Sequence, residues 1–169
     1  TNTITGVCGS WTDSVPHLII SGQVFLNQTI RTTGLRQLGV QEINIIDLVK
    51  PVTKYAVMIE DPATIKYHLQ KAVYIAKTGR PGPVWLDIPA NIQNAKIEEQ
   101  ELKGFDPAEL PRSDDPHLRQ KAAEVALHLL QAKRPLLHAG QGIKIAQAVD
   151  DFMSLVEHYR FPFVTARNA

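Results

Sequence analysis

The sequence has a single cysteine, little net charge and no long apolar run, and each of these absences excludes a class of protein. Cys8 has no partner for an internal disulfide, which fits a reducing, cytoplasmic location. A net charge of +1 provides no basic surface for nucleic acid, and no apolar run approaches the roughly 18 residues of a membrane span. We therefore expect a cytoplasmic globular protein with no nucleic-acid partner and no membrane anchor.

Motifs of self-contained active sites are also missing. The sequence contains no GxSxG, HExxH, CxxC or Walker motif, so we assign no catalytic residue and no metal ligand within this chain. No leader or initiating methionine precedes Thr1, and residues 168–169 directly follow an apolar run. Both ends are therefore expected to be cuts in a longer protein.

A regular alternation of short apolar runs with amphipathic stretches fills the rest of the sequence. The runs are bounded by glycine or proline and are apolar on both faces, which is typical of strands buried between two helix layers. We expect five strands, at residues 17–21, 55–59, 83–88, 135–139 and 161–166. Short strands that alternate with helices predict a parallel sheet flanked by helices, so the expected fold class is α/β.

The expected helices have recognisable boundaries and apolar stripes. For the helix after the second strand, Asp61 can cap the first turn, Pro62 suits that turn and Gly79 ends the helix. Three more helices are expected, over residues 3–15, from residue 115 onward, and on the stripe formed by Ile145, Val149, Phe152 and Val156.

Charges and prolines interrupt this pattern between residues 91 and 115, which indicates an interdomain linker. We expect a first domain over residues 1–97, a linker over residues 98–115 and an incomplete second domain over residues 116–169. In the second domain, Gly140 and Gly142 belong to a GQG turn between a strand and a helix. These glycines would let the backbone approach a phosphate closely, or they only form a tight turn.

Several motifs in a fixed order resemble one enzyme family. They are TNTITGV at residues 1–7, DSVP at 13–16, ISGQV at 20–24, QE at 41–42, PVTK at 51–54, GRPGPV at 79–84 and DIP at 87–89. Together they are similar to the TNxxxGxxxAxxDSxPxxxxxGQV block and the later motifs of acetolactate synthase and pyruvate oxidase, which depend on thiamine diphosphate. The resemblance runs nearly end to end, since residues 134–135, the glycine turn and residues 163–165 resemble the start of that family's middle domain.

The resemblance implies a fold and a cofactor. Residues 1–97 would be most of a pyrimidine-binding domain that lacks its first strand or strands, and residues 116–169 the start of a Rossmann-like middle domain. In such enzymes the first domain holds the aminopyrimidine of thiamine diphosphate, and a partner subunit's C-terminal domain holds the Mg-diphosphate, so a homodimer or homotetramer is implied. The glutamate that activates the cofactor belongs upstream of Thr1, and the magnesium site lies outside this chain.

The resemblance also implies roles for individual residues. Asn2 and Gln41 would contact the pyrimidine, since carboxamides offer both donors and acceptors to such a ring. Asn2 could instead cap a helix, or do both, and Gln41 could be a surface residue of a loop. Arg80 would help to bind FAD, or would fix the domain interface through carboxylates or carbonyls. Glutamines 23 and 37 are expected to be surface residues.

Departures from acetolactate synthase point to a different acceptor. Val40 stands where that enzyme has phenylalanine, Ala90 stands where it has lysine, and the loop at residues 25–39 is longer. By resemblance these positions line the substrate channel, so the acceptor is expected to differ from the second 2-oxo acid of acetolactate synthesis. The LRQLG stretch at residues 35–39 is similar to relatives that transfer a two-carbon unit to a keto sugar.

We therefore predict a fragment of a transferase or lyase, a carboligase or decarboxylase that cleaves a 2-oxo acid such as pyruvate and passes the resulting unit to a carbonyl acceptor. The fragment alone is expected to be inactive, because the activating glutamate and the magnesium motif would lie outside it. The alternatives are a noncatalytic assembly module and a generic nucleotide-binding α/β domain. The second alternative rests only on the fold and the glycine turn.

Overall fold

Two compact units make up the chain, Thr1–Arg112 and Ser113–Ala169. The computed structural model describes residues 1–31, 33–111 and 115–166. Each unit contains a parallel sheet with helices beside it, so the expected α/β class and the expected parallel sheet are confirmed. Among the described residues, no helix is both long and apolar enough to span a lipid bilayer.

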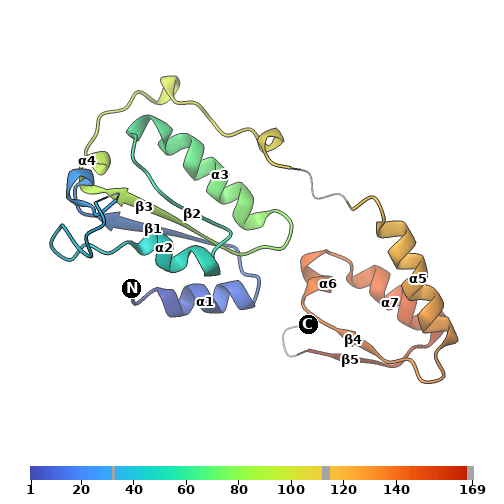
Figure 1. The fold of residues 1–169 in the computed structure, drawn as a ribbon. Helices are drawn as coiled ribbons and strands as arrows, with labels where there is room; N and C mark the ends of the chain where they lie inside the picture. The colour runs from blue at the N-terminus through green and yellow to red at the C-terminus, as the bar shows by residue number, and fades with distance from the viewer. Residues whose placement is uncertain (32, 112–114, 167–169) are drawn as a thin grey trace. The chain divides into compact units, whose positions relative to one another are not determined.

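The first unit is built on a sheet of three parallel strands in the order β1-β3-β2 (Figure 1). The strands are β1 (His17–Gln23), β2 (Tyr55–Met58) and β3 (Pro83–Pro89). Leu18 and Tyr55 both lie opposite Val84, and all three strands run in the same direction. The carboxyl ends of the three strands therefore lie at the same end of the sheet.

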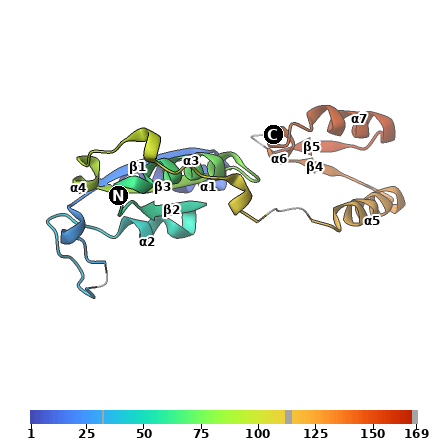
Figure 2. The same ribbon diagram turned by 90° about the horizontal axis from the view of Figure 1, so that it is seen from above.

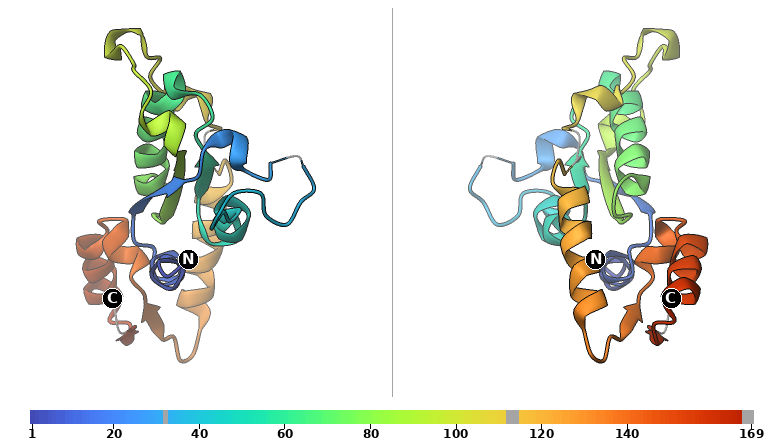
Figure 3. Two further views of the ribbon diagram at one scale, coloured as in Figure 1. Left: turned by 90° about the vertical axis from the view of Figure 1, so that its left-hand side faces the viewer. Right: turned by 90° about the vertical axis from the view of Figure 1, so that its right-hand side faces the viewer.

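Helices cover both faces of this sheet, and Figures 2 and 3 show the layers from further directions. One face is covered by α3 (Ile65–Lys77) and α4 (Ala90–Gln93), and the other by α1 (Ile4–Thr12) and α2 (Ile45–Val49). The buried core under α3 and α4 consists of Ile59, Ala72, Ala76, Val84, Leu86 and Ile92. The core under α1 and α2 consists of Val7, Ile19, Ile45, Val49 and Trp85. Successive residues of β3 thus enter opposite cores, as the alternation of side chains along a strand requires.

Burial differs between the strands. β3 is the central strand and is buried along nearly its whole length. β1 lies at an edge of the described sheet, and the Ile20 side chain on it is 55% exposed. The expectation that each strand is buried between helix layers is therefore wrong at Ile20, although Ile19 beside it is buried. It is also wrong for the last strand, Phe163–Thr165, whose three residues are all exposed.

The boundaries of α3 follow the expected signals. The Asp61 side chain accepts a hydrogen bond from the Ala63 N–H at 2.9 Å, and a 3-10 turn at Pro62–Thr64 leads into the helix. Gly79, just after the helix, has a φ of +63°, a left-handed conformation that glycine adopts without steric cost. Short-range chemistry therefore determines where this helix begins and ends.

The segment after α4 runs along α3 and contacts it. It includes 3-10 turns at Glu99–Glu101 and Pro107–Glu109. The Phe105 N–H donates to Oε1 of Gln70 at 2.8 Å, and the Phe105 ring packs edge-on against Tyr67 with the centroids 5.7 Å apart. Part of the expected linker is thus held on the surface of the first unit, while the proposed domain boundaries stay a prediction.

The second unit contains another pair of parallel strands. Its elements are α5 (Leu118–Gln131), β4 (Leu137–Ala139), α6 (Gly142–Ile145), α7 (Val149–Tyr159) and β5 (Phe163–Thr165). β4 and β5 pair in parallel across the crossover formed by α6 and α7. The expected single helix through Ile145 and Val149 is wrong, because Gln147 has a left-handed φ of +56° that separates α6 from α7.

Candidate functional site

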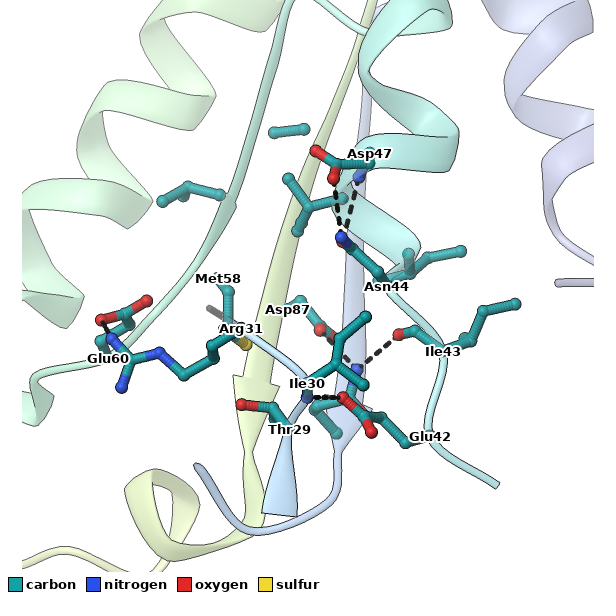
Figure 4. Close-up of a pocket in the computed structure, with 15 residues that line it drawn as sticks. Thr29, Ile30, Arg31, Glu42, Ile43, Asn44, Asp47, Met58, Glu60 and Asp87 are labelled. Carbon is teal, nitrogen blue, oxygen red and sulfur yellow. Dashed lines mark hydrogen bonds and ion pairs between the residues drawn. The ribbon is translucent and has the colours of Figure 1, made fainter. Parts of the chain in front are cut away.

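A pocket of about 290 Å³ lies in the first unit, where the strands end (Figure 4). Its lining comes from the strand ends, from the segment before residue 32 and from the segment that leads into α2. The lining residues are Gln23, Thr29, Ile30, Arg31, Glu42, Ile43, Asn44, Ile45, Ile46, Asp47, Ala56, Val57, Met58, Glu60 and Asp87. Crevices outside the carboxyl ends of parallel strands are the usual ligand sites of α/β proteins, so this pocket is the candidate site.

Asp87 is the most deeply buried charged residue of the pocket, with 1% of its surface exposed. Its Oδ1 accepts a hydrogen bond from the Ser21 hydroxyl at 2.6 Å, and its Oδ2 accepts one from the Gln23 amide at 3.0 Å. The Trp85 indole N–H donates to Oγ of Ser21 at 2.7 Å, which leaves the hydroxyl proton for Asp87. Each carboxylate oxygen therefore has a donor, as a buried charge requires.

Burial raises the pKa of Asp87 above its ordinary value of 3.8, although the hydrogen bonds from Ser21 and Gln23 offset part of that effect. A carboxyl group with a raised pKa at the end of a strand is typical of functional sites. Because neighbouring side chains already use both oxygens, we assign Asp87 the part of holding Ser21 and Gln23 in place.

Gln23 joins different segments at this end of the sheet, whereas Gln37 bonds within its own loop. Nε2 of Gln23 donates both to Asp87 and, at 2.9 Å, to the carbonyl of Ile43. Nε2 of Gln37 donates to the carbonyl of Gly39 at 3.0 Å. The expectation that Gln37 is a surface residue is confirmed, since its side chain is exposed. The same expectation is wrong for Gln23, which is half-buried and links β1 to β3 and to the backbone of Ile43.

Glu42 binds backbone N–H groups from two separate stretches of chain. Its carboxylate accepts a hydrogen bond from Ile30, a second from Leu38 at 2.9 Å and a third from Gly39 at 3.1 Å. Burial acts to raise the pKa of Glu42, but these three backbone hydrogen bonds outweigh it and lower the pKa below its ordinary value of 4.5. Glu42 is therefore held as a carboxylate at neutral pH.

The rim of the pocket has two further polar pairs. Arg31 forms an ion pair with Glu60, and Nδ2 of Asn44 donates to Oδ2 of Asp47 at 2.7 Å. Among the described lining residues there are thus four carboxylates and one guanidinium, next to apolar side chains from β2 and α2. Each of these carboxylates already has a hydrogen-bond or ion-pair partner within the protein, so they hold the pocket wall together, and the apolar side chains suit an apolar group.

Neither of the two predicted pyrimidine contacts, Asn2 and Gln41, is among the residues that line this pocket. Asn2 lies just before α1, near the end of the chain marked N in Figure 1. Gln41 immediately precedes the pocket residue Glu42, and both predicted carboxamides are exposed. Thr3 occupies the N-cap position of α1, although its side chain makes no capping hydrogen bond, so the alternative that Asn2 stands at the cap is wrong. Contact with a pyrimidine stays a prediction for both residues.

Arg80 lies at the opposite end of the sheet, in the loop between α3 and β3. Its Nε donates to Oγ of Ser14 at 2.7 Å, and its guanidinium lies 3.5 Å from the Thr12 carbonyl. Ser14 has a left-handed φ of +56°, so α1 ends before it and the expected helix over residues 3–15 is too long. Arg80 thus ties the turn after α1 to β3, and its contact with FAD stays a prediction.

The predicted phosphate-binding glycines belong to the second unit. Gly140 follows β4 and Gly142 begins α6, which has only four residues. A Cβ added at either position would meet nothing within 4 Å, so local packing does not require glycine there. Their contact with a phosphate stays a prediction.

In the part of the chain that the structure describes, no three His, Cys, Asp or Glu side chains are placed to hold a metal ion.

Sequence reasoning missed Asp87 and Glu42. Asp87 is the one charged residue in the strand PVWLDIP, and a charge in an otherwise apolar buried strand needs partners, so a signal was present. Glu42 had no such signal, because its partners are backbone groups and one of them, at Ile30, is 12 residues away.

No protein-family model matches the chain, but curated proteins are similar to it along almost its whole length. It is 31% identical to the acetolactate synthase large subunit of Lactococcus lactis, over 98% of this chain and 28% of that protein. It is 36% identical to the acetolactate synthase large subunit of Corynebacterium glutamicum, over 98% and 25%. It is 31% identical to the probable acetolactate synthase large subunit of Methanocaldococcus jannaschii, over 98% and 27%. The chain therefore spans about a quarter of the length of these relatives.

Proposed function

Because the chain belongs to the thiamine-diphosphate-dependent enzymes and is acetolactate synthase large-subunit-like, we propose that its full-length protein cleaves a 2-oxo acid such as pyruvate and transfers the resulting two-carbon unit to a carbonyl acceptor. The observation on which this proposal rests is similarity over 98% of the chain to acetolactate synthase large subunits of bacteria and of an archaeon. The assignment as a transferase or lyase is part of the same proposal.

The residues of the first unit suit the aminopyrimidine of thiamine diphosphate. The apolar side chains of the pocket suit a ring, and the exposed carboxamides of Asn2 and Gln41 can both donate to it and accept from it. When bound, thiamine diphosphate supplies the nucleophilic carbon that the reaction needs. The part proposed for this chain is to bind and orient the ring, while Asp87 and Gln23 hold the pocket wall in place.

The proposal extends to the acceptor substrate, the metal ion and the partner subunits. Val40 is 86% exposed and so is available to line a substrate channel, where its small side chain leaves room for a larger acceptor such as a keto sugar. We propose magnesium at a site outside this chain and a homodimer or homotetramer as the assembly. FAD has less support, because Arg80 already binds Ser14 within the first unit.

The test uses the full-length apoprotein, titrated with thiamine diphosphate at saturating magnesium while pyruvate consumption is followed. Gln41→Ala should weaken cofactor binding by about five- to hundredfold, since an unpaired polar group in a closed site costs roughly 1–3 kcal/mol. The matched control is Gln100→Ala, an exposed glutamine on a 3-10 turn, which should stay within about twofold of wild type.

Two results would count against the proposal in different ways. A wild-type protein that neither binds the cofactor nor consumes pyruvate would favour the noncatalytic assembly module. Binding by Gln41→Ala within about twofold of wild type would remove Gln41 from the cofactor site while leaving the enzyme class intact. The 169-residue chain alone is expected to show no turnover at any cofactor concentration.

A further inference from the structure

Glu42 joins two stretches of backbone beside the pocket, and Figure 4 shows one of its bonds, to Ile30. The other two bonds come from consecutive N–H groups, those of Leu38 and Gly39. The Glu42 side chain is 8% exposed, so water does not readily replace these donors. Hydrogen bonds to a charged acceptor are about twice as strong as neutral ones, so this carboxylate holds the backbone around it firmly.

The chain next to Glu42 is closely packed. The Glu42 N–H donates to the Gly39 carbonyl at 3.2 Å, which closes a tight turn around residues 40 and 41. A Cβ on Gly39 would lie 2.8 Å from the backbone oxygen of Gln28, so this approach requires glycine.

Gln41 occupies an uncommon backbone conformation inside this turn. Its φ is +60°, in the left-handed region, which a residue with a side chain adopts only at a steric cost. The Glu42 carboxylate binds Leu38 and Gly39 on the far side of the turn and is itself adjacent to Gln41. These bonds compensate for a conformation that Gln41 would not keep by itself.

We propose that Glu42 is a positioning residue whose carboxylate presets the turn at Gln41 before the cofactor binds. The proposal rests on the proposed function, in which Gln41 contacts the pyrimidine. Glu42 acts through Gln41, since its oxygens already accept from three backbone N–H groups. Pre-ordering of the turn removes an entropy cost from cofactor binding, so the predicted effect is on affinity and not on the chemical step.

The experiment compares Glu42→Ala and Glu42→Gln in the full-length protein with Glu101→Ala, an exposed glutamate on a 3-10 turn. Calorimetry measures the affinity for thiamine diphosphate, and kcat is measured at saturating cofactor. Hydrogen–deuterium exchange reports on the Leu38 and Gly39 amides. Glu42→Ala should raise Kd at least about tenfold, change kcat less than about threefold and speed exchange at both amides. Glu42→Gln keeps an acceptor oxygen and should fall between Glu42→Ala and wild type, whereas Glu101→Ala should match wild type.

Faster amide exchange in Glu42→Ala with Kd within about twofold of wild type would overturn the proposal, because the turn would then be anchored without preparing a cofactor site. Unchanged exchange would also overturn it, by showing that Glu42 is no anchor. If Glu42→Ala does not fold, Glu42→Gln makes the same test. A wild-type protein that binds no thiamine diphosphate would defeat the proposed function instead, and the exchange measurement would still report on the anchor.

Discussion

Two buried carboxylates of the first unit, those of Asp87 and Glu42, have opposite pKa shifts. Burial dominates at Asp87, whose donors are two side chains, and its pKa is raised. Backbone donors dominate at Glu42, where three N–H groups converge, and its pKa is lowered. The hydrogen bonds to Asp87 therefore only partly offset the cost of burying its charge, whereas the backbone N–H groups around Glu42 favour its charged form.

Removal of the Asp87 carboxylate should destabilise the protein. Asp87→Ala leaves the Ser21 hydroxyl and the Gln23 amide without their shared acceptor, which should lower the free energy of unfolding by about 1–3 kcal/mol. Urea denaturation checks this value, with the exposed Asp13→Ala as the matched control. A loss within about 0.5 kcal/mol of the control would show that the network contributes little to stability.

The free energy of unfolding should depend on pH through the ionisation of Glu42. Because its pKa is lowered in the folded state, its contribution is complete above its ordinary value of 4.5 and is lost as the pH falls through the lowered value. Wild type should therefore exceed Glu42→Gln in free energy of unfolding by a constant amount above pH 4.5, and this difference should shrink at lower pH. Denaturant titrations across this pH range measure it, and a difference that grows on acidification would contradict the prediction.

The segment after α4 packs on α3 because one position has no side chain. A Cβ on Gly104 would lie 2.7 Å from Oε1 of Gln70, the atom that accepts the Phe105 N–H. Phe105 then packs between Tyr67 and Tyr74, with Nζ of Lys71 5.8 Å from the centroid of its ring. A side chain at position 104 would therefore displace the end of the flexible Gln70 side chain, and with it the acceptor of the Phe105 N–H.

A double-mutant cycle tests that dependence. Gly104→Ala and Gln70→Ala should each lower the free energy of unfolding by about 1 kcal/mol, because each breaks the same bond to the Phe105 N–H. The double variant should be little less stable than Gln70→Ala, since the added methyl group no longer displaces a partner. Thermal unfolding of the wild type and the three variants gives the coupling energy between the two positions. Additive effects would show that Gly104→Ala destabilises the protein through the backbone and not through Gln70.

The two units of the chain differ in how much of their secondary structure is buried. β3 is buried along nearly all its length, whereas α5 contains no buried residue and all three residues of β5 are exposed. Helices and strands without a buried face derive little stability from packing. The first unit should therefore be the more stable part of this chain.

Hydrogen–deuterium exchange followed by mass spectrometry checks this order of stability in the 169-residue chain. Peptides from residues 83–89 should be the most protected, and peptides from 118–131 and 163–165 the least. Equal protection in both units would show that the second unit is stabilised by contacts other than burial of these elements.

The sequence by itself determined the features that depend on neighbouring residues. The strand runs, the cap at Asp61, the stop at Gly79 and the α/β class all follow from local pattern and turn chemistry. The ordered motifs along the chain were likewise sufficient for the enzyme family. Local signals were insufficient where a single residue changed the path, as Gln147 does between α6 and α7.

Only the tertiary structure decided which polar groups meet. Gln23 and Asp87 are 64 residues apart, and Arg80 and Ser14 are 66 apart, so no spacing in the sequence predicts either pair. The Glu42 anchor is equally invisible, because its donors are backbone N–H groups that every residue but proline has. Packing likewise decided that Ile20 is exposed, whereas Ile19 beside it on β1 is buried in the core under α1 and α2.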